Sequence, residues 1–374
     1  MTATPITAYA AYNALGKNAE GVLEALAAGR SGLDRIESRS GPSRCWGRAP
    51  NPPALPEALG AIDNRARRLL ASVCGDLAQP VVTACRRWGA HRVALVLGVH
   101  GPDAQWLREA TEASTPTRVV HERGTQGPLT LAQQLLDLRG PAYCVAGEGA
   151  AGAAAIAAGH RLLQAGLADA VVAGGVGVLS SVVGESYASR RLLSEDEARP
   201  LSAVRAGTSL GEGAALVLME RHGDAFVELL GSAEAHDGTG AGRAATPAIS
   251  AALERAGVDA GSVGFVQMHA PGTITHDFNE SAALRECFGA GMPVASMVGA
   301  TGLVLGAAGA TDVIVAAAAL RDGFIPNTVG CDPPDSTLGV VASARRRELE
   351  QDYALVHAAT LGGRSVALVI GARA

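Results

Sequence analysis

Histidine and carboxylate side chains are the groups in this sequence whose types and spacing could carry acid–base chemistry. His269 ends the apolar run 263–268, and Asp277 and Glu280 follow it by eight and eleven residues. An imidazole at the end of a strand can exchange a proton, or donate a hydrogen bond, where a substrate comes within reach. Glu148 is a further candidate acid or base. These residues predict acid–base chemistry, and the elements around them must bring them together.

The thiols predict no metal or redox site. The six cysteines form no C-x-x-C pair, so neither a zinc site nor a redox motif is expected. A chain of 374 residues can bury a sizeable core without disulfides, so reduced, mostly buried thiols in a cytoplasmic protein are expected. Cys144 is interpreted as a core residue of a strand. Cys85 precedes Arg86, Arg87 and Trp88, which do not fit the small-residue helix of a buried nucleophile.

The composition indicates a folded chain with a core of small side chains. Hydrophobic residues make up 48% and charged residues 18%, which excludes disorder. The net charge is −5 without a Lys/Arg block, so neither nucleic acid nor a membrane surface is an expected partner. The N-terminus lacks a secretory signal pattern. Asp312 inside the apolar window 302–320 favours a buried helix over a membrane span.

Apolar β-type runs alternate with Ala- and Leu-rich helical runs along the chain. This alternation is typical of an α/β fold, with largely parallel sheets covered on both faces. Thr246 and Pro247 are expected to begin one helix that Gly257 ends, and Asn18 and Gly29 to bracket another. Buried strands are expected at residues 93–98, 170–175, 214–219, 263–268, 294–297, 353–357 and 365–370.

An internal sequence repeat indicates a duplicated structural unit. Residues 149–166 and 306–323 both open with GAAGA and close with Gly, at an offset of 157 residues. Each is apolar on nearly all sides over its first turns, so each is expected to be a helix sandwiched between other layers. We therefore expect two halves, residues 1–223 with a helix starting at Gly149, and residues 224–374 with His269 and a buried helix from Gly306 to Gly323.

Motifs along nearly the whole chain, from about Ile6 to Gly371, resemble one family. Residues 199–213 resemble R-P-F-D-x-x-R-x-G-x-x-x-G-E-G, and residues 301–309 match T-G-H-x-x-G-A-A-G apart from the histidine. Residues 168–175 and 362–370 resemble the strand after the nucleophile helix and the terminal glycine pair with its last strand. The chain is thereby identified as a member of the β-ketoacyl synthase family of the thiolase superfamily. This resemblance implies a dimer and a five-layer αβαβα thiolase fold.

The resemblance also implies where catalytic side chains belong, and most are absent. The family's nucleophilic Cys lies three residues before a Gly and twelve before an Arg, which places it at Gly149. Such a thiolate would be favoured by the helix dipole. Glycine offers no atom to acylate. The family's second His position is Leu303, and its supporting Lys position is Val298. A buried cation would be costly in this apolar site.

Other pocket residues are retained or replaced. His269, with its downstream Asp277 and Glu280, resembles the family's first His. Of two threonines that hold the pantetheine arm in the family, only Thr273 remains. The remaining candidates for the substrate pocket are Glu148, His357 and Leu361.

These replacements favour a subunit without condensing activity. The resemblance points to a chain length factor-like partner of an active ketosynthase, forming a heterodimer that shapes the acyl or polyene tunnel in type II polyketide, aryl polyene or fatty-acid-like biosynthesis. An acyl carrier protein bearing phosphopantetheine is a further expected partner, and no cofactor or metal is expected. In related dimers the strand at about Ala142–Ala146 pairs with its partner's copy, and Leu129–Leu138 would lie near the partner's pocket.

Two other functions remain open. The first is a divergent acyl-thioester hydrolase or decarboxylase, in which His269, with Glu148 or His357, activates water or substrate directly because no Cys nucleophile is present. The second is a homodimeric scaffold that binds a carrier protein.

Overall fold

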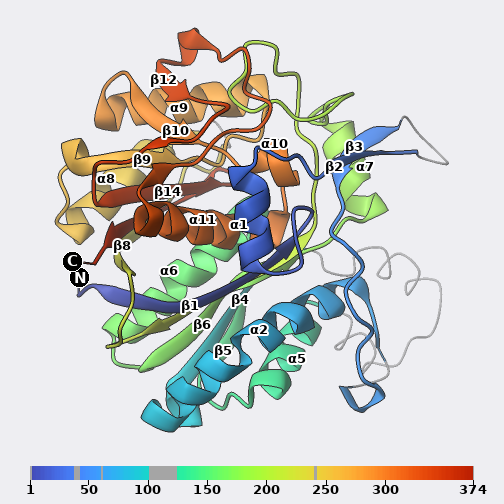
Figure 1. Cartoon of the computed structure of the whole chain (residues 1–374), viewed down its shortest axis with the longest axis vertical. Helices are drawn as coiled ribbons and strands as arrows, with labels where there is room; N and C mark the ends of the chain where they lie inside the picture. The colour runs from blue at the N-terminus through green and yellow to red at the C-terminus, as the bar shows by residue number, and fades with distance from the viewer. Residues whose placement is uncertain (1, 38–42, 60–61, 101–123, 240–241, 374) are drawn as a thin grey trace.

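The computed structural model describes residues 2–37, 43–59, 62–100, 124–239 and 242–373. Its helices and strands stack in layers, with two helices, α6 and α11, in the centre (Figure 1). None of the described helices is long and apolar enough to cross a membrane.

The first half of the chain supplies five strands of the sheet and its covering helices. The strands are β1 (Thr4–Asn13), β4 (Val93–Val99), β5 (Ala142–Ala146), β6 (Ala170–Gly177) and β7 (Gly213–Glu220). The helices are α1 (Ala19–Ala27), α2 (Arg65–Trp88), α5 (Gln126–Leu136), α6 (Ala151–Gln164) and α7 (Ser181–Ser189), and a small hairpin pairs β2 (Leu33–Ile36) with β3 (Arg44–Gly47).

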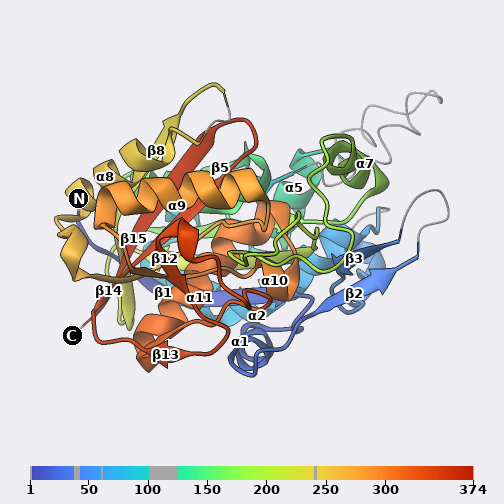
Figure 2. The same cartoon turned by 90° about the horizontal axis from the view of Figure 1, so that it is seen from above.

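The second half repeats this order. Its strands are β8 (Val227–His236), β9 (Val263–Gln267), β10 (Met292–Ala295), β14 (Tyr353–Ala359) and β15 (Arg364–Ala372), with β12 (Val340–Ala342) at the edge and β11 (Phe324–Ile325) paired with β13 (Arg347–Glu348). Its helices are α8 (Ala245–Ala256), α9 (Ile274–Phe288), α10 (Val298–Thr301) and α11 (Ala308–Asp322). The hairpin β2–β3 and α7 lie at the opposite end of the molecule from α8 and β8 (Figure 2).

The two halves have the same strand order and the same strand directions. The full order is β12-β10-β9-β14-β15-β8-β1-β7-β6-β4-β5, so β5-β4-β6-β7-β1 corresponds to β10-β9-β14-β15-β8. In each half the first two of these pairings are parallel and the last two are antiparallel. The expectation of largely parallel sheets was therefore wrong, because β7 and β15 each return directly beside the preceding strand. The halves meet where Thr4 and Pro5 of β1 pair with β8.

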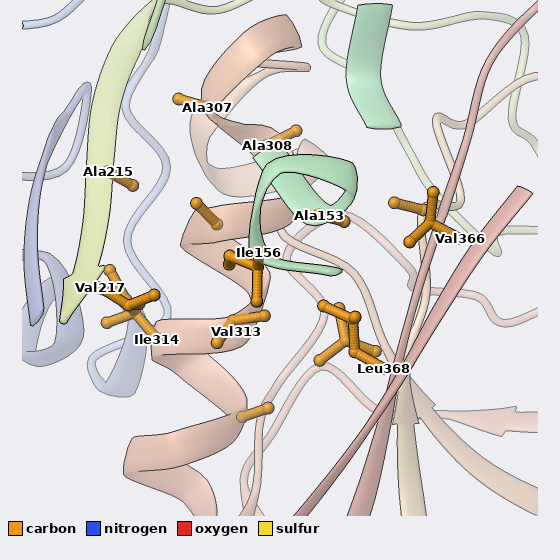
Figure 3. Close-up of a cluster of buried hydrophobic side chains, with 14 of the residues drawn as sticks. Ala153, Ile156, Ala215, Val217, Ala307, Ala308, Val313, Ile314, Val366 and Leu368 are labelled. Carbon is orange, nitrogen blue, oxygen red and sulfur yellow. The ribbon is translucent and has the colours of Figure 1, made fainter. Parts of the chain in front are cut away.

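Three hydrophobic clusters fill the spaces between five layers. One joins α2 and α5 to the first half-sheet, one joins α8 and α9 to the second, and the largest surrounds α6 and α11 between the two. Figure 3 shows the central layer, where Ile156 of α6 and Val313 of α11 lie between Val217 of β7 and Leu368 of β15. The duplicated α/β unit and the αβαβα arrangement predicted from the sequence are confirmed.

Both central helices begin in the same way. A 3₁₀ turn, Glu148–Ala150 or Leu305–Ala307, precedes the α-helix, so the helix expected from Gly149 is α-helical only from Ala151. Glu148 and Leu305 have left-handed backbones, with φ of 43° and 45°. This conformation costs free energy in non-glycine residues and persists where the surrounding structure imposes it. The strain therefore belongs to the duplicated fold and is not confined to one half.

The expected helix ends are partly right. The Asn18 side chain caps α1 through the N–H of Gly21, and Gly257 ends α8 with a left-handed backbone. Thr246 does not cap α8, because the helix already begins at Ala245 and the Thr246 hydroxyl instead donates to Glu286. The chain passes from one topological half to the other between Glu220 and Val227, and the division at residues 223 and 224 into two domains stays a prediction.

Candidate functional site

A cavity of about 50 Å³ opens where the N-terminus of α6 meets the β9–α9 connection and the β14–β15 turn. Its interior has room for a few water molecules, and it opens to solvent. The structure brings most of the predicted site residues together on its wall. They are Glu148, Gly149, His269, Thr273, Glu280, Leu303, His357 and Leu361. Asp277 does not line it, and Val298 lines a neighbouring cavity of about 10 Å³ together with His269 and Leu303.

The imidazole of His269 occupies the space beside Gly149. A Cβ atom built on Gly149 would lie 2.6 Å from His269 Cε1 and 3.4 Å from the carbonyl oxygen of Ala359. Real Cβ atoms do not approach other atoms this closely, so a side chain at this position requires the ring to move. The position that the resemblance assigns to a nucleophile is therefore closed by a histidine.

His269 is held through its backbone, while its ring is left without a partner. Its N–H donates to Glu280 Oε1 over 2.9 Å, and the N–H of Ala270 donates to Glu280 Oε2 over 2.8 Å. Within the described residues, no hydrogen bond reaches the imidazole nitrogens. Burial lowers the pKa of His269 to about 4, so the ring is neutral at neutral pH and carries one N–H that a ligand could accept.

Glu280 also joins His357 and Ser365 into a chain of hydrogen bonds. His357 Nδ1 lies 2.5 Å from Glu280 Oε1, and His357 Nε2 lies 2.7 Å from the hydroxyl of Ser365. All three side chains are buried and line the cavity. Burial acts to raise the pKa of Glu280, yet that pKa lies below its ordinary value because His357 and the backbone N–H groups stabilise the carboxylate.

Ser365 is the site residue that the sequence reasoning missed. His357 lies opposite Ala367 and Ala359 lies opposite Ser365, so His357 and Ser365 are diagonal neighbours across the β14–β15 hairpin. Side chains in such diagonal positions on one face of a sheet can touch. The glycine pair 362–363 marks the turn of this hairpin. Pairing the residues on either side of the turn would have placed His357 near Ser365 and was the sequence signal for this contact.

Two of the expected ligand-binding groups are engaged in local structure. The Thr273 hydroxyl caps α9 by accepting from the N–H of His276 and lies 2.7 Å from His276 Nδ1. Glu148 Oε2 accepts a hydrogen bond from the N–H of Leu361 over 2.8 Å. Glu148 thereby ties the turn before α6 to the β14–β15 turn, and Thr273 fixes the start of α9.

Asp277, the other carboxylate downstream of His269, binds backbone N–H groups. Its two oxygens accept from the N–H groups of Leu201 and Gly272, each over 2.9 Å, and Arg205 lies 3.8 Å away. Asp277 does not line the cavity. It holds together the loops that follow α7 and β9, so its role is to position the wall of the site.

No cysteine lies at the site, although the structure describes all six positions. Cys144 donates to the carbonyl of Thr125, and burial raises its pKa to about 11. Burial also raises the pKa of Cys85, which lies on α2. The described residues that line the cavity include neither. The part of the chain that the structure describes also contains no cluster of three or more His, Cys, Asp or Glu placed to hold a metal ion.

The small second cavity has a mainly apolar lining and contains one buried carboxyl group. Val298 and Leu303 line it beside Asp312, whose Oδ1 accepts from Gln267 Nε2 over 3.0 Å. Burial raises the pKa of Asp312 to about 8. The folded chain therefore binds a proton that the unfolded chain releases near pH 4, and charging this group opposes folding.

Asp312→Asn should stabilise the chain, and increasingly so at higher pH. Between the ordinary pKa and about 8, the wild type loses roughly 1.4 kcal/mol of stability per pH unit through this one group, and the loss is complete above pH 8. The asparagine oxygen can still accept from Gln267 without carrying a charge. The difference in thermal midpoint between variant and wild type should grow from pH 6 to pH 8 and then level off. A difference that stays constant over this range would contradict a neutral buried Asp312.

Two family models match the part of the chain that forms most of the described sheet. Residues 92–225 match the domain described as "Beta-ketoacyl synthase, N-terminal domain", and residues 227–332 match "Beta-ketoacyl synthase, C-terminal domain". Nodulation protein E of Rhizobium meliloti is 30% identical over 307 residues, covering 76% of this chain and 77% of the relative. The 3-oxoacyl-[acyl-carrier-protein] synthase 2 of Rhizobium meliloti (strain 1021) is 31% identical over 264 residues, covering 62% and 61%.

Solved structures share the whole fold. The complex of the ketosynthase ApeO with its chain length factor ApeC from Xenorhabdus doucetiae contains a chain that is 25% identical, with a TM-score of 0.87, covering 99% of this chain and 98% of that one. The ishigamide ketosynthase/chain length factor matches at 21% identity and a TM-score of 0.85, covering 100% and 99%. These neighbours have the layered arrangement described above.

Proposed function

This chain belongs to the β-ketoacyl synthase family, and from this premise we propose that it is a non-condensing, chain length factor-like subunit that pairs with an active ketosynthase. In that heterodimer it shapes the tunnel for the growing acyl or polyene chain. Condensation then takes place on the partner's cysteine, and an acyl carrier protein delivers the substrate to the complex.

The observation that carries the proposal is the arrangement at Gly149. The residue at the start of α6 has no side chain, the His269 ring fills the adjacent space, and the described wall of the cavity includes no thiol. A ketosynthase forms its acyl-enzyme on a cysteine at this position, so the carbon–carbon bond must form elsewhere. Leu303 and Val298 make the surroundings apolar, which agrees with loss of the remaining catalytic groups.

The proposed partner surface is the free edge of the sheet. β5 is the last strand on its side, and all of its residues are partly buried or exposed. Tyr143 has 37% of its surface exposed. An edge strand offers unpaired backbone groups to a strand of another chain. An edge strand without charged side chains, such as β5, is suited to such pairing. The neighbouring helix α5 would then lie beside the partner's pocket.

Co-expression with an active ketosynthase from the same organism should yield a heterodimer, measured by native mass spectrometry. Tyr143→Asp places a charge on the β5 edge and should reduce heterodimer formation by about tenfold or more, since burying an unpaired charge is costly. Phe226→Asp is the matched control. Phe226 is an exposed aromatic residue in the β7–β8 connection, with 72% exposure, and its replacement should leave the complex intact.

Two results would contradict the proposed role. The first is recovery of the two proteins as separate species, with the same product length whether or not this chain is present. The second is equal loss of the complex in both Asp variants, which would mean that the β5 edge is not the surface used.

A further inference from the structure

The chain Glu280–His357–Ser365 has the connectivity of a catalytic triad. A hydroxyl lies 2.7 Å from one imidazole nitrogen, and a carboxylate oxygen lies 2.5 Å from the other. Nucleophilic serines are activated by this combination of a base within hydrogen-bond reach and a third group that orients the base. The three residues come from α9, β14 and β15, elements that the sheet and its covering helix hold rigidly together.

The carboxylate is fixed before any substrate arrives. Glu280 accepts the N–H groups of His269 and Ala270 in addition to His357, so it cannot rotate away without losing all three bonds. In the tautomer that donates from Nδ1 to the Glu280 carboxylate, the His357 ring is left with Nε2 as an acceptor. The hydroxyl of Ser365 is then the donor of the 2.7 Å bond, which is the direction that proton removal from serine requires.

A second buried Ser–His pair in the same chain shows what is special about this one. Ser232 Oγ lies 3.1 Å from His160 Nδ1, but the other nitrogen of His160 faces the side-chain amide of Gln164. His160 therefore has no carboxylate to stabilise a positive charge, and burial lowers its pKa to about 4. The described lining of the cavity includes neither Ser232 nor His160, whereas it includes Ser365, His357 and Glu280.

The same cavity holds a donor for a carbonyl oxygen. The neutral His269 ring carries an N–H without a partner in the described residues, and its backbone shares Glu280 Oε1 with His357. An N–H on the wall of a cavity can stabilise the oxyanion that develops when a carbonyl group is attacked there. The cavity thus combines a nucleophile, a base, an orienting carboxylate and an electrophilic donor.

We propose that Ser365 is the nucleophile of an acyl-thioester hydrolase site, with His357 as general base and acid, Glu280 as the positioning residue for His357, and His269 as the donor to the carbonyl oxygen. The substrate class, an acyl group on a pantetheine-type thiol, rests on the proposed function. The activity would remove acyl chains that the condensing partner does not extend. It differs from direct activation of water by His269, because a covalent serine ester is formed.

The reaction balances with water as the only co-reactant. Ser365 Oγ bonds to the thioester carbonyl carbon while its proton passes to His357 Nε2. The carbon–sulfur bond then breaks, and His357 gives that proton to the leaving thiolate. In the second half, water bonds to the ester carbonyl carbon and loses a proton to His357. The bond to Ser365 Oγ breaks, the serine takes the proton back, and a carboxylic acid leaves.

The test uses the full chain alone, with hexanoyl-N-acetylcysteamine as the thioester probe. We expect thiol release and, after rapid quenching, a hexanoyl adduct that peptide mass spectrometry assigns to Ser365. Ser365→Ala should abolish the adduct and lower hydrolysis by about 100-fold or more, and His357→Gln should do the same. Ser232→Ala, which removes the other buried serine–histidine bond, should hydrolyse the probe at the wild-type rate.

The remaining outcomes also decide the matter. Equal rates in Ser365→Ala and wild type, or an adduct on another residue, would overturn the proposal. If Ser365→Ala does not fold, Ser365→Cys keeps the volume, and its introduced thiol should still be acylated; a folded thiol variant that takes no acyl group would overturn the proposal as well. Because no ketosynthase is present, failure here is distinguishable from failure of the heterodimer, which the co-expression experiment measures separately.

Discussion

Gly306→Ala should leave the chain without a stable fold. A Cβ atom on Gly306 would lie 2.2 Å from the carbonyl oxygen of Val176 and 3.2 Å from that of Gly98. Both oxygens belong to central strands, β6 and β4, whose backbones are fixed by partners on either side. The clash cannot be relieved by a side-chain rotation, so we expect destabilisation of at least about 3 kcal/mol and loss of soluble protein.

Gly75→Ala is the matched control for this prediction. Gly75 lies inside α2, and an added Cβ would have no atom within 4 Å. Alanine loses less backbone entropy than glycine in a helix, so this variant should be more stable by ~0.5–1 kcal/mol. Thermal melting of both variants checks the pair. A folded Gly306→Ala protein with a wild-type melting temperature would show that the turn Leu305–Ala307 does not approach β6 this closely.

Gly149→Cys should not restore carbon–carbon bond formation. The new Cβ would lie 2.6 Å from His269 Cε1, so the thiol can enter only if the imidazole leaves its place. Leu303 and Val298 would still stand at the positions that the resemblance assigns to the second histidine and the lysine, so we expect decarboxylation of a malonyl group to lack its hydrogen-bond donors. We expect product at least about 1,000-fold below that of an active ketosynthase, on the scale of losing a catalytic group.

The measurement separates acyl loading from condensation. Intact mass spectrometry after incubation with an acyl carrier protein reports loading, and product analysis with malonyl carrier protein reports bond formation. Gly149→Ala serves as the control for crowding alone, because it displaces His269 without adding a thiol. Measurable condensation by the single Gly149→Cys variant would mean that the losses at positions 298 and 303 do not matter.

Gly149 and Gly306 occupy equivalent positions in the duplicated fold, but different neighbouring atoms exclude a side chain at each. Both follow a left-handed residue in the turn before a central helix. At Gly306 the neighbouring atoms are backbone, whereas at Gly149 the nearest atom is the end of a histidine side chain. Glycine is thus imposed by the fold at position 306 and is tied to the site at position 149.

Local sequence patterns determined the elements and their duplication. The apolar runs at residues 93–98 and 365–370 became β4 and β15, and the repeated GAAGA segments became the turns and first residues of the two central helices. The resemblance to the ketosynthase family places the nucleophile position at Gly149 through its spacing to Gly152 and Arg161, and this assignment stays a prediction. These features could be predicted since each depends on residues close together in the chain.

Contacts between distant residues were decided only by the tertiary structure. Glu280 and His357 are 77 residues apart, and the hydrogen bond between them exists because the fold brings the Glu280 side chain of α9 to the β14–β15 hairpin. The closure of the Gly149 position by His269, and the antiparallel return of β7 and β15, likewise depend on how the layers stack. A sequence records which groups are present, whereas distances of a few ångströms between them are set by packing summed over the whole core.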